Sequence, residues 1–211
     1  MRDDLSVSGA TIESVTSGHK WPTCLLLKAD GQLHSFGQVA LDAYHALSAS
    51  DSRQWLLFER FKMPLYIHDR IGKLTRHTCV QAANGQQAPI LHVISLALKY
   101  LARRVLQHVR QVCGQQLPTD AIRWVLTVPA VWTSSAKQLM RQAAYDAGLA
   151  SRVNPEQLLI ALEAEAASIF CRSLPLAQQL DCPSQVKIES LLPGMCVWST
   201  CKYLYRLFHL D

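Results

Sequence analysis

The sequence lacks the residue patterns of the common metal, disulfide and hydrolase sites. Its seven cysteines form no Cys-x-x-Cys pair and show no zinc-like spacing. Its eight histidines include no His-Glu-x-x-His motif, and no Gly-x-Ser-x-Gly elbow occurs. An odd number of cysteines suits a reducing compartment, where thiols act mostly as small apolar side chains. The sequence therefore supports neither a disulfide scaffold nor a hydrolase.

Long apolar runs and basic tracts are missing as well, and we expect no secretory leader. The start, Met1-Arg2-Asp3-Asp4, has no apolar segment of the kind a signal peptide needs. No stretch reaches the roughly 18 apolar residues of a membrane span. The formal net charge is +5, but the lysines and arginines are scattered, so they form no patch typical of nucleic-acid binding. We expect a cytoplasmic protein that binds neither nucleic acid nor membranes.

The composition is that of a globular protein, with 49% hydrophobic and 18% charged residues. Asp30-Gly31, between the short apolar runs Cys24–Leu27 and Leu33–Phe36, predicts a hairpin with a type I′ turn. A short helix is expected over Gln38–Leu47. Asp51–Met63 is interpreted as a partly buried helix or strand edge that Pro64 ends.

The clearest helix signal lies in the middle of the chain. Leu65–Ala82 alternates weakly and predicts two short strands, with Asn84-Gly85 as the next turn. From Ile90 to Val112 the apolar residues then repeat at i, i+3 and i+4, and Gly114 stands where a C-cap glycine belongs. A stripe this regular indicates core packing rather than chemistry.

A strand–helix–strand unit follows. Two short apolar segments are separated by a stretch whose small and apolar residues recur at helical spacing, which predicts parallel strands joined by a right-handed crossover. The expected elements are the strand Ile122–Val128 ended by Pro129, a helix capped by Ser134 or Ser135, the strand Gln157–Leu162, and a helix over Glu163–Cys171.

Three parts of this unit carry a family resemblance. They are Thr127-Val128-Pro129-Ala130 at a strand end, a helix closed at Gly148, and a strand running into Leu162-Glu163-Ala164-Glu165. This order resembles the nucleotide-binding domain of the heat-shock 70 kDa chaperones. The residues at these positions look more like those of the divergent heat shock 70 kDa protein 12 branch. The resemblance covers roughly three quarters of the chain.

The resemblance implies an α/β fold. The expected architecture is part of an actin-like, ribonuclease-H-like ATPase domain, namely lobe I with its inserted subdomain, lacking the first phosphate loop and lobe II. It divides the chain into a loose leader (1–18), the partial lobe (19–174) and a divergent apolar and basic tail (175–211).

The resemblance also implies roles for individual residues. Glu163 matches an acidic residue that approaches the magnesium and γ-phosphate of ATP through water, a contact that suits a hard cation. Pro129 matches a switch proline that reports nucleotide state, and Lys137 stands where the chaperones have a relaying arginine. A lysine that stabilises the transferred phosphoryl group is matched by Lys62, or by Arg60, only with a one-residue shift. No residue is expected to ligate a metal directly.

The glycine-rich phosphate loops of the family are absent. Close backbone approach to a polyphosphate requires glycine, and the nine glycines here include no Gly-Gly and no Gly-x-Gly. The family role is ATP and magnesium binding, but we expect weak or no nucleotide binding and no hydrolysis.

Two alternatives to a nucleotide-binding fragment remain open. One is a non-enzymatic interaction module that competes for the partners of a full-length relative, and the other is a non-functional truncated product. A partial lobe is also expected to expose apolar surface, which favours self-association or docking of the tail.

Overall fold

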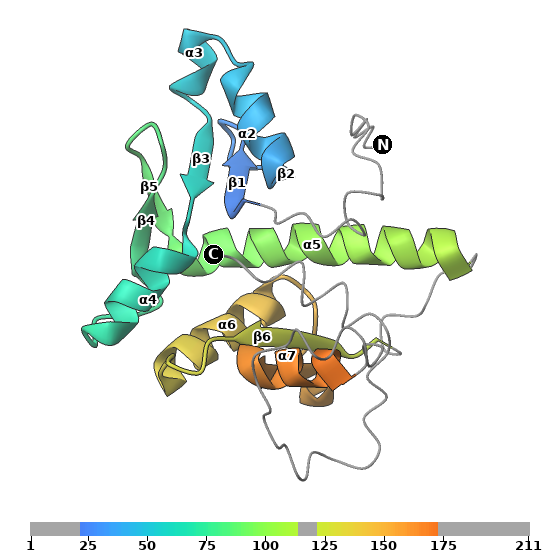
Figure 1. Ribbon diagram of the computed structural model, residues 1–211. Coiled ribbons are helices and arrows are strands. Elements are labelled where there is room, and N and C mark those ends of the chain that lie inside the picture. The colour runs from blue at the N-terminus through green and yellow to red at the C-terminus, as the bar shows by residue number, and fades with distance from the viewer. Residues whose placement is uncertain (1–21, 114–121, 173–211) are drawn as a thin grey trace.

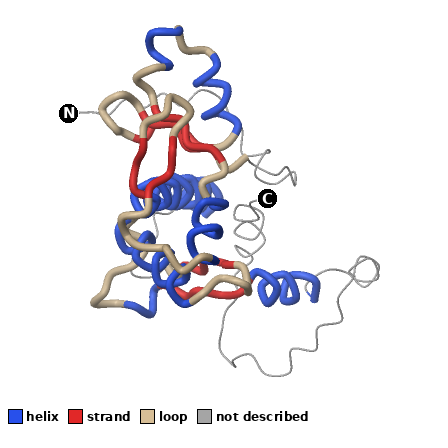
Figure 2. Tube along the Cα trace, turned by 90° about the vertical axis from the view of Figure 1, so that its left-hand side faces the viewer, coloured by secondary structure: helices blue, strands red, loops and turns tan. Residues whose placement is uncertain are grey.

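The computed structural model describes residues 22–113 and 122–172. One long helix, α5 (Ile90–Cys113), runs between two layers (Figure 1). A sheet of three strands lies on one side of α5, and a parallel strand pair with its helices lies on the other. Figure 2, which views α5 from near its end, shows strands above and below it. The expected α/β class is confirmed.

The three-stranded sheet has the order β2-β1-β3 and is antiparallel throughout. The central strand is buried on both faces, because Leu25 and Leu27 face the main core and Cys24 and Leu26 face a second, smaller core under α2. This two-sided burial explains the continuous apolar sequence of β1. The elements of this layer are β1 (Cys24–Leu27), β2 (Leu33–Phe36), α2 (Gln38–His45), α3 (Ala49–Ser52) and β3 (Leu56–Glu59).

The turn between β1 and β2 differs from the type I′ expectation. Gly31 has φ of 78°, but Asp30 does not have positive φ. The Lys28 amide donates to the Gln32 carbonyl at 2.9 Å, the Gly31 amide donates to the Lys28 carbonyl at 2.9 Å, and the register shifts at Leu27. The connection is thus a three-residue loop with a glycine bulge, so one positive φ is sufficient.

The prediction for Leu65–Ala82 was wrong. Residues Lys62–Arg70 form a helix, α4, and only Cys79–Gln81 is a strand, β4, which pairs with β5 (Gln87–Pro89) around Asn84-Gly85. Pro64 does not end an element but is the third residue of α4. Proline is tolerated there because the amides of the first helical turn have no partner within the helix.

The strand–helix–strand unit is confirmed. Strands β6 and β7 pair in parallel, from Trp124 opposite Leu158 to Val128 opposite Leu162. The predicted cap of α6 is corrected to Thr133, whose side chain accepts from the Ser135 amide. The elements are β6 (Trp124–Val128), α6 (Ser134–Asp146), η2 (Pro155–Gln157), β7 (Leu158–Leu162) and α7 (Glu163–Arg172).

One continuous main core joins both layers, with α5 in its middle. Its fully buried side chains come from the β1–β3 sheet, from α4, from the first half of α5, and from β6 and α6. Among the described residues, no helix is long and apolar enough to cross a membrane. The predicted leader, the tail and the Gly114 cap lie outside the described residues.

Candidate functional site

The candidate site lies at the carboxyl ends of the parallel strands. Val128 and Leu162 are register partners and end β6 and β7, so Pro129 and Glu163, the next residue of each chain segment, leave the sheet at the same edge. This edge is where open α/β sheets usually bind ligands. Glu163 is also the first residue of α7, where the positive end of the helix dipole favours a carboxylate.

Lys62 meets Glu163 at this edge. The Lys62 Nζ lies 2.9 Å from Glu163 Oε1, although the two residues are 101 positions apart in the chain. Both side chains are 20% exposed, so the ion pair is shielded from most of the solvent. Lys62 begins α4, where the helix dipole disfavours a cation, and the Glu163 carboxylate offsets that cost. Of the two sequence candidates, Lys62 is therefore the one brought to Glu163.

Arg60, the other candidate, has a different environment. It is exposed and adopts a left-handed backbone with φ of 48°, and its amide donates to the Thr23 carbonyl at 2.9 Å. Its side chain makes no hydrogen bond or ion pair with another residue of the described ranges.

Trp132 covers the Lys62 ammonium and was not predicted from the sequence. Its ring is buried, with its centroid 5.9 Å from Lys62 Nζ, which is within reach of a cation–π interaction. The Trp132 amide donates to the Pro129 carbonyl at 3.2 Å, so a tight turn joins the end of β6 to this ring. An aromatic residue four positions beyond a strand end was the available signal.

A buried carboxylate, also missed, fixes α4 against the start of α6. Asp69 is 4% exposed, and one of its oxygens accepts from the Thr133 amide at 2.9 Å. The Thr133 hydroxyl donates to the other oxygen. The sequence could not reveal this contact while the segment around Asp69 was interpreted as a strand. Asp69 and Lys62 thus hold the two ends of α4 against the segments that follow β6 and β7.

Glu165 has a local structural role. Its carboxylate accepts from the Leu162 amide at 3.3 Å, which is one half of a capping box at the start of α7. The Glu165 carboxylate, which is the second negative charge beside Glu163, therefore pairs with the Leu162 amide at the start of α7.

Lys137 is not joined to the other candidates. It is half-buried on α6, and its backbone amide donates to the Thr133 carbonyl at 3.1 Å. Within the two described ranges, no ion pair links its ammonium to Glu163. The same ranges hold no group of three or more metal-binding side chains.

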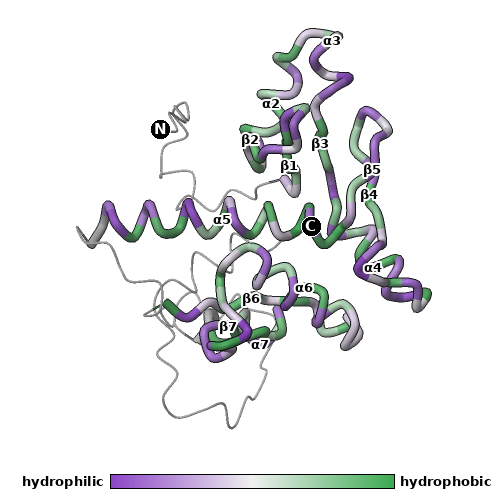
Figure 3. Tube along the Cα trace, turned by 180° about the vertical axis from the view of Figure 1, so that it is seen from behind, coloured by the Kyte–Doolittle hydropathy of each residue, from purple (hydrophilic) through white to green (hydrophobic). Residues whose placement is uncertain are grey.

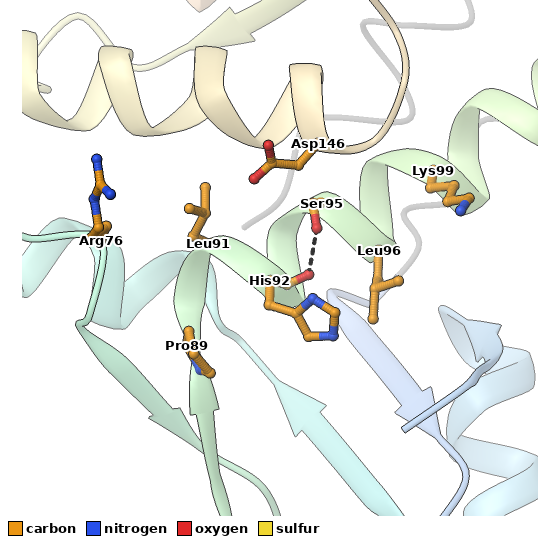
Figure 4. A pocket seen from close by; sticks show the side chains of 8 residues that line it. All are labelled: Arg76, Pro89, Leu91, His92, Ser95, Leu96, Lys99 and Asp146. Atoms are coloured by element: carbon orange, nitrogen blue, oxygen red, sulfur yellow. Dashed lines mark hydrogen bonds between the residues drawn. The ribbon is translucent and has the colours of Figure 1, made fainter. Parts of the chain in front are cut away.

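An open cavity of about 320 Å³ lies away from this site, between the first half of α5 and the end of α6 (Figure 4). Arg76, Lys99 and Asp146 contribute charges of both signs to its wall, and the Ser95 hydroxyl in the wall donates to the His92 carbonyl at 2.8 Å. None of Lys62, Pro129, Lys137 and Glu163 lines it. The cavity and the candidate site are therefore separate features.

Comparison with known proteins identifies the family. No protein-family model matches the chain. The chain is similar to human heat shock 70 kDa protein 12B, with 51% identity over 162 residues, which is 77% of this chain and 23% of that protein. It is also similar to human and mouse heat shock 70 kDa protein 12A, each with 45% identity over 173 residues, which is 82% of this chain and 25% of those proteins.

The chain spans about a quarter of the length of these curated relatives. The matched share of the chain is nevertheless large enough to include most of the described residues, and the identity is far above the level at which sequences agree by chance. The chain belongs to the heat shock 70 kDa protein 12A/12B branch of the heat-shock 70 kDa family.

Proposed function

We propose that this chain contains the first lobe of an actin-like nucleotide-binding domain, and that alone it binds Mg-ATP weakly or not at all and hydrolyses none. The observation that carries the proposal is the Lys62–Glu163 pair at the carboxyl ends of β6 and β7. Family membership supports the nucleotide-binding origin, and the state of this pair supports the weakness of binding.

The two side chains have the chemistry that a hydrated magnesium nucleotide needs. An ammonium such as that of Lys62 neutralises a phosphoryl oxygen, and a carboxylate such as Glu163 takes a divalent cation through its water shell. When bound, Mg-ATP would supply the phosphoryl group and the cation. In this chain the two groups neutralise each other at 2.9 Å, so a nucleotide has to separate them first.

The glycines of the described residues offer no substitute for a phosphate loop. Gly31, Gly37, Gly72, Gly85 and Gly148 all have positive φ, and they lie in hairpin turns or beside helix ends. The connections from β3 to α4 and from β6 to α6 contain no glycine. Side chains therefore stand where a polyphosphate would need close backbone contact.

Isothermal titration of the full chain with Mg-ATP tests this proposal. We expect no binding heat at micromolar concentrations, and no phosphate release above buffer in a parallel hydrolysis assay. Glu163→Gln should leave both results unchanged, as should the control Glu156→Gln on the exposed η2 turn. Micromolar affinity for Mg-ATP would contradict the proposal. Turnover that Glu163→Gln abolishes and Glu156→Gln does not would also contradict it.

A non-enzymatic interaction module is the second candidate. It is favoured by the apolar side chains that α4 exposes to solvent, since neighbouring exposed apolar residues are a mark of interaction sites. This candidate does not depend on the result of the nucleotide titration.

A further inference from the structure

Helix α4 carries an apolar stripe on its outer side. Met63 and Ile67 of α4 and its C-cap residue Ile71 are 51%, 52% and 57% exposed, and their spacing of four residues places them along one face of the helix. The opposite face holds Leu65 and Asp69, which are buried. We call these three residues the α4 stripe. Over its eight intervening residue steps the stripe extends about 12 Å, roughly two helical turns.

The position of α4 leaves the stripe accessible. The helix lies at the edge of the molecule in two opposite views (Figures 1 and 3). The other large exposed apolar residues, Val131 and Val153, lie outside α4. The stripe is therefore a local concentration of exposed apolar surface, unlike the isolated apolar residues that are normal on protein surfaces.

The charges around the stripe have one sign. Residues 60–76 contain five cations and a single acid. That acid, Asp69, is buried and already accepts two hydrogen bonds from Thr133. Lys62 is paired with Glu163, whereas the other four cations are exposed, namely Arg60, Arg70, Lys73 and Arg76.

We propose that the α4 stripe is a docking surface for an acidic amphipathic helix of a partner protein. Apolar anchors at i and i+4 on the partner would cover Met63, Ile67 and Ile71, and carboxylates beside them would face Arg70, Lys73 and Arg76. Helix-on-helix docking of this kind needs only two or three anchors on a short face. The unlike charges give the contact its orientation and its association rate.

The same charges argue against two other occupants. A second copy of the chain would bring the four exposed cations of one α4 segment against those of the other. The apolar part of residues 175–211 carries Lys202 and Arg206, which are also cations. An anionic membrane suits the charge, but the stripe presents three aliphatic side chains and lacks the exposed aromatic anchors of interfacial helices.

The test is fluorescence anisotropy of the full chain with three labelled synthetic helices. The first has leucines at i and i+4 flanked by glutamates, the second has the same leucines flanked by lysines, and the third has the glutamates with serines in place of the leucines. Only the first should bind with micromolar affinity, and the affinity should fall as salt is raised. Equal binding of the first two helices would overturn the proposal.

Variants of the chain locate the contact. Met63→Ser/Ile67→Ser/Ile71→Ser should weaken binding of the first helix at least about tenfold. Arg70→Glu/Lys73→Glu/Arg76→Glu should abolish that binding and admit the lysine-flanked helix. Val153→Ser, which removes an apolar side chain that is 95% exposed, is the matched control and should change nothing. Because all seven positions are exposed, circular dichroism should show folded variants.

Four outcomes would contradict the proposal. Unchanged affinity in the triple serine variant would show that the helix binds elsewhere. Sedimentation of the parent as a dimer and of the serine variant as a monomer would make a second copy the occupant. Tighter peptide binding after deletion of residues 181–211 would show that the chain's own tail covers the α4 stripe. If phosphatidylserine vesicles capture the parent but not the triple serine variant, and no peptide binds, the α4 stripe is a membrane-binding surface.

Discussion

Two cysteines illustrate how the surroundings of a residue decide its chemistry. Cys24 is buried under α2, and its Sγ lies 4.0 Å from Glu59 Oε1. Burial, and next the negative charge of Glu59, raise the pKa of the Cys24 thiol to about 11, although Arg60 opposes the shift. Cys79, on β4, is exposed. The sequence alone gave no basis for separating the two thiols.

We predict that Cys24 resists alkylation while Cys79 reacts. With a pKa of about 11 for Cys24, only about 0.1% of this thiol is thiolate at pH 8, and the thiolate is the reactive form. Iodoacetamide labelling followed by peptide mass spectrometry should show Cys79 modified first and Cys24 only after unfolding. Equal labelling rates in the native protein would contradict the burial of Cys24.

The same shift makes stability depend on pH. A pKa raised in the folded state means that the neutral thiol is favoured by folding. Its contribution is complete below the ordinary thiol pKa and is lost as the pH rises through about 11. The unfolding free energy should therefore fall between roughly pH 9 and 11, and Cys24→Ala should remove that part of the fall.

At the scale of elements, the strength of the local pattern decided what could be predicted. Helix α5 and strands β6 and β7 were predicted to within about two residues, because each has a strong apolar pattern. Helix α4 was missed because its nine residues bury only Leu65 and Asp69 and because Pro64 suggested a break. In a short helix whose large apolar residues are mostly exposed, few buried positions repeat, so the helical pattern is hard to recognise in the sequence.

The link between α4 and α6 supports a specific prediction. Asp69→Asn keeps the size of the side chain but removes the negative charge that accepts both hydrogen bonds from Thr133, and the Thr133 hydroxyl has to reverse its direction to pair with the new amide. A hydrogen bond to a charged group contributes about 1.5–3 kcal/mol, and urea denaturation at neutral pH should show a loss of that order.

The control for this prediction is Asp42→Asn. The Asp42 carboxylate is exposed and, within the described ranges, accepts only from the Gln38 side chain, at 2.8 Å, so its loss should change stability by less than about 0.5 kcal/mol. If both variants unfold at the urea concentration of the parent, the Asp69–Thr133 contact does not stabilise the fold.

At the scale of the whole molecule, we expect the main core to unfold as one unit, because it is a single cluster of buried side chains from Leu25 in β1 to Leu158 in β7. Leu126, in β6, is 1% exposed in that core. Leu126→Asp should cost several kcal/mol because it buries an unpaired carboxylate. Thermal unfolding followed by circular dichroism should show one transition at a much lower temperature than in the parent, whereas Val153→Asp, at an exposed position, should melt near the parent temperature.

The candidate site was only partly predictable, because it is assembled from segments that lie far apart in the sequence. Glu163 and Pro129 belong to one motif and could be found from it, whereas Lys62 comes from a segment 101 residues before Glu163 and required a shifted alignment. Trp132 and Asp69 became visible only when the fold brought α4 to the parallel strands. Sequence patterns reveal residues that are close along the chain, whereas this site is formed by residues that are close only in the folded structure.

The long helix between the layers has two unlike halves. From Ile90 to Ala102 its inner side chains are buried in the main core, whereas from Arg103 to Gln111 no side chain is fully buried. Its backbone amides should therefore exchange with solvent deuterium on different timescales, although they belong to one helix. Amides in the first half open only when the whole domain unfolds, and those in the second half open by local fraying. Exchange rates along α5 should thus report the global stability of the protein in its first half and the local opening of the helix end in its second half.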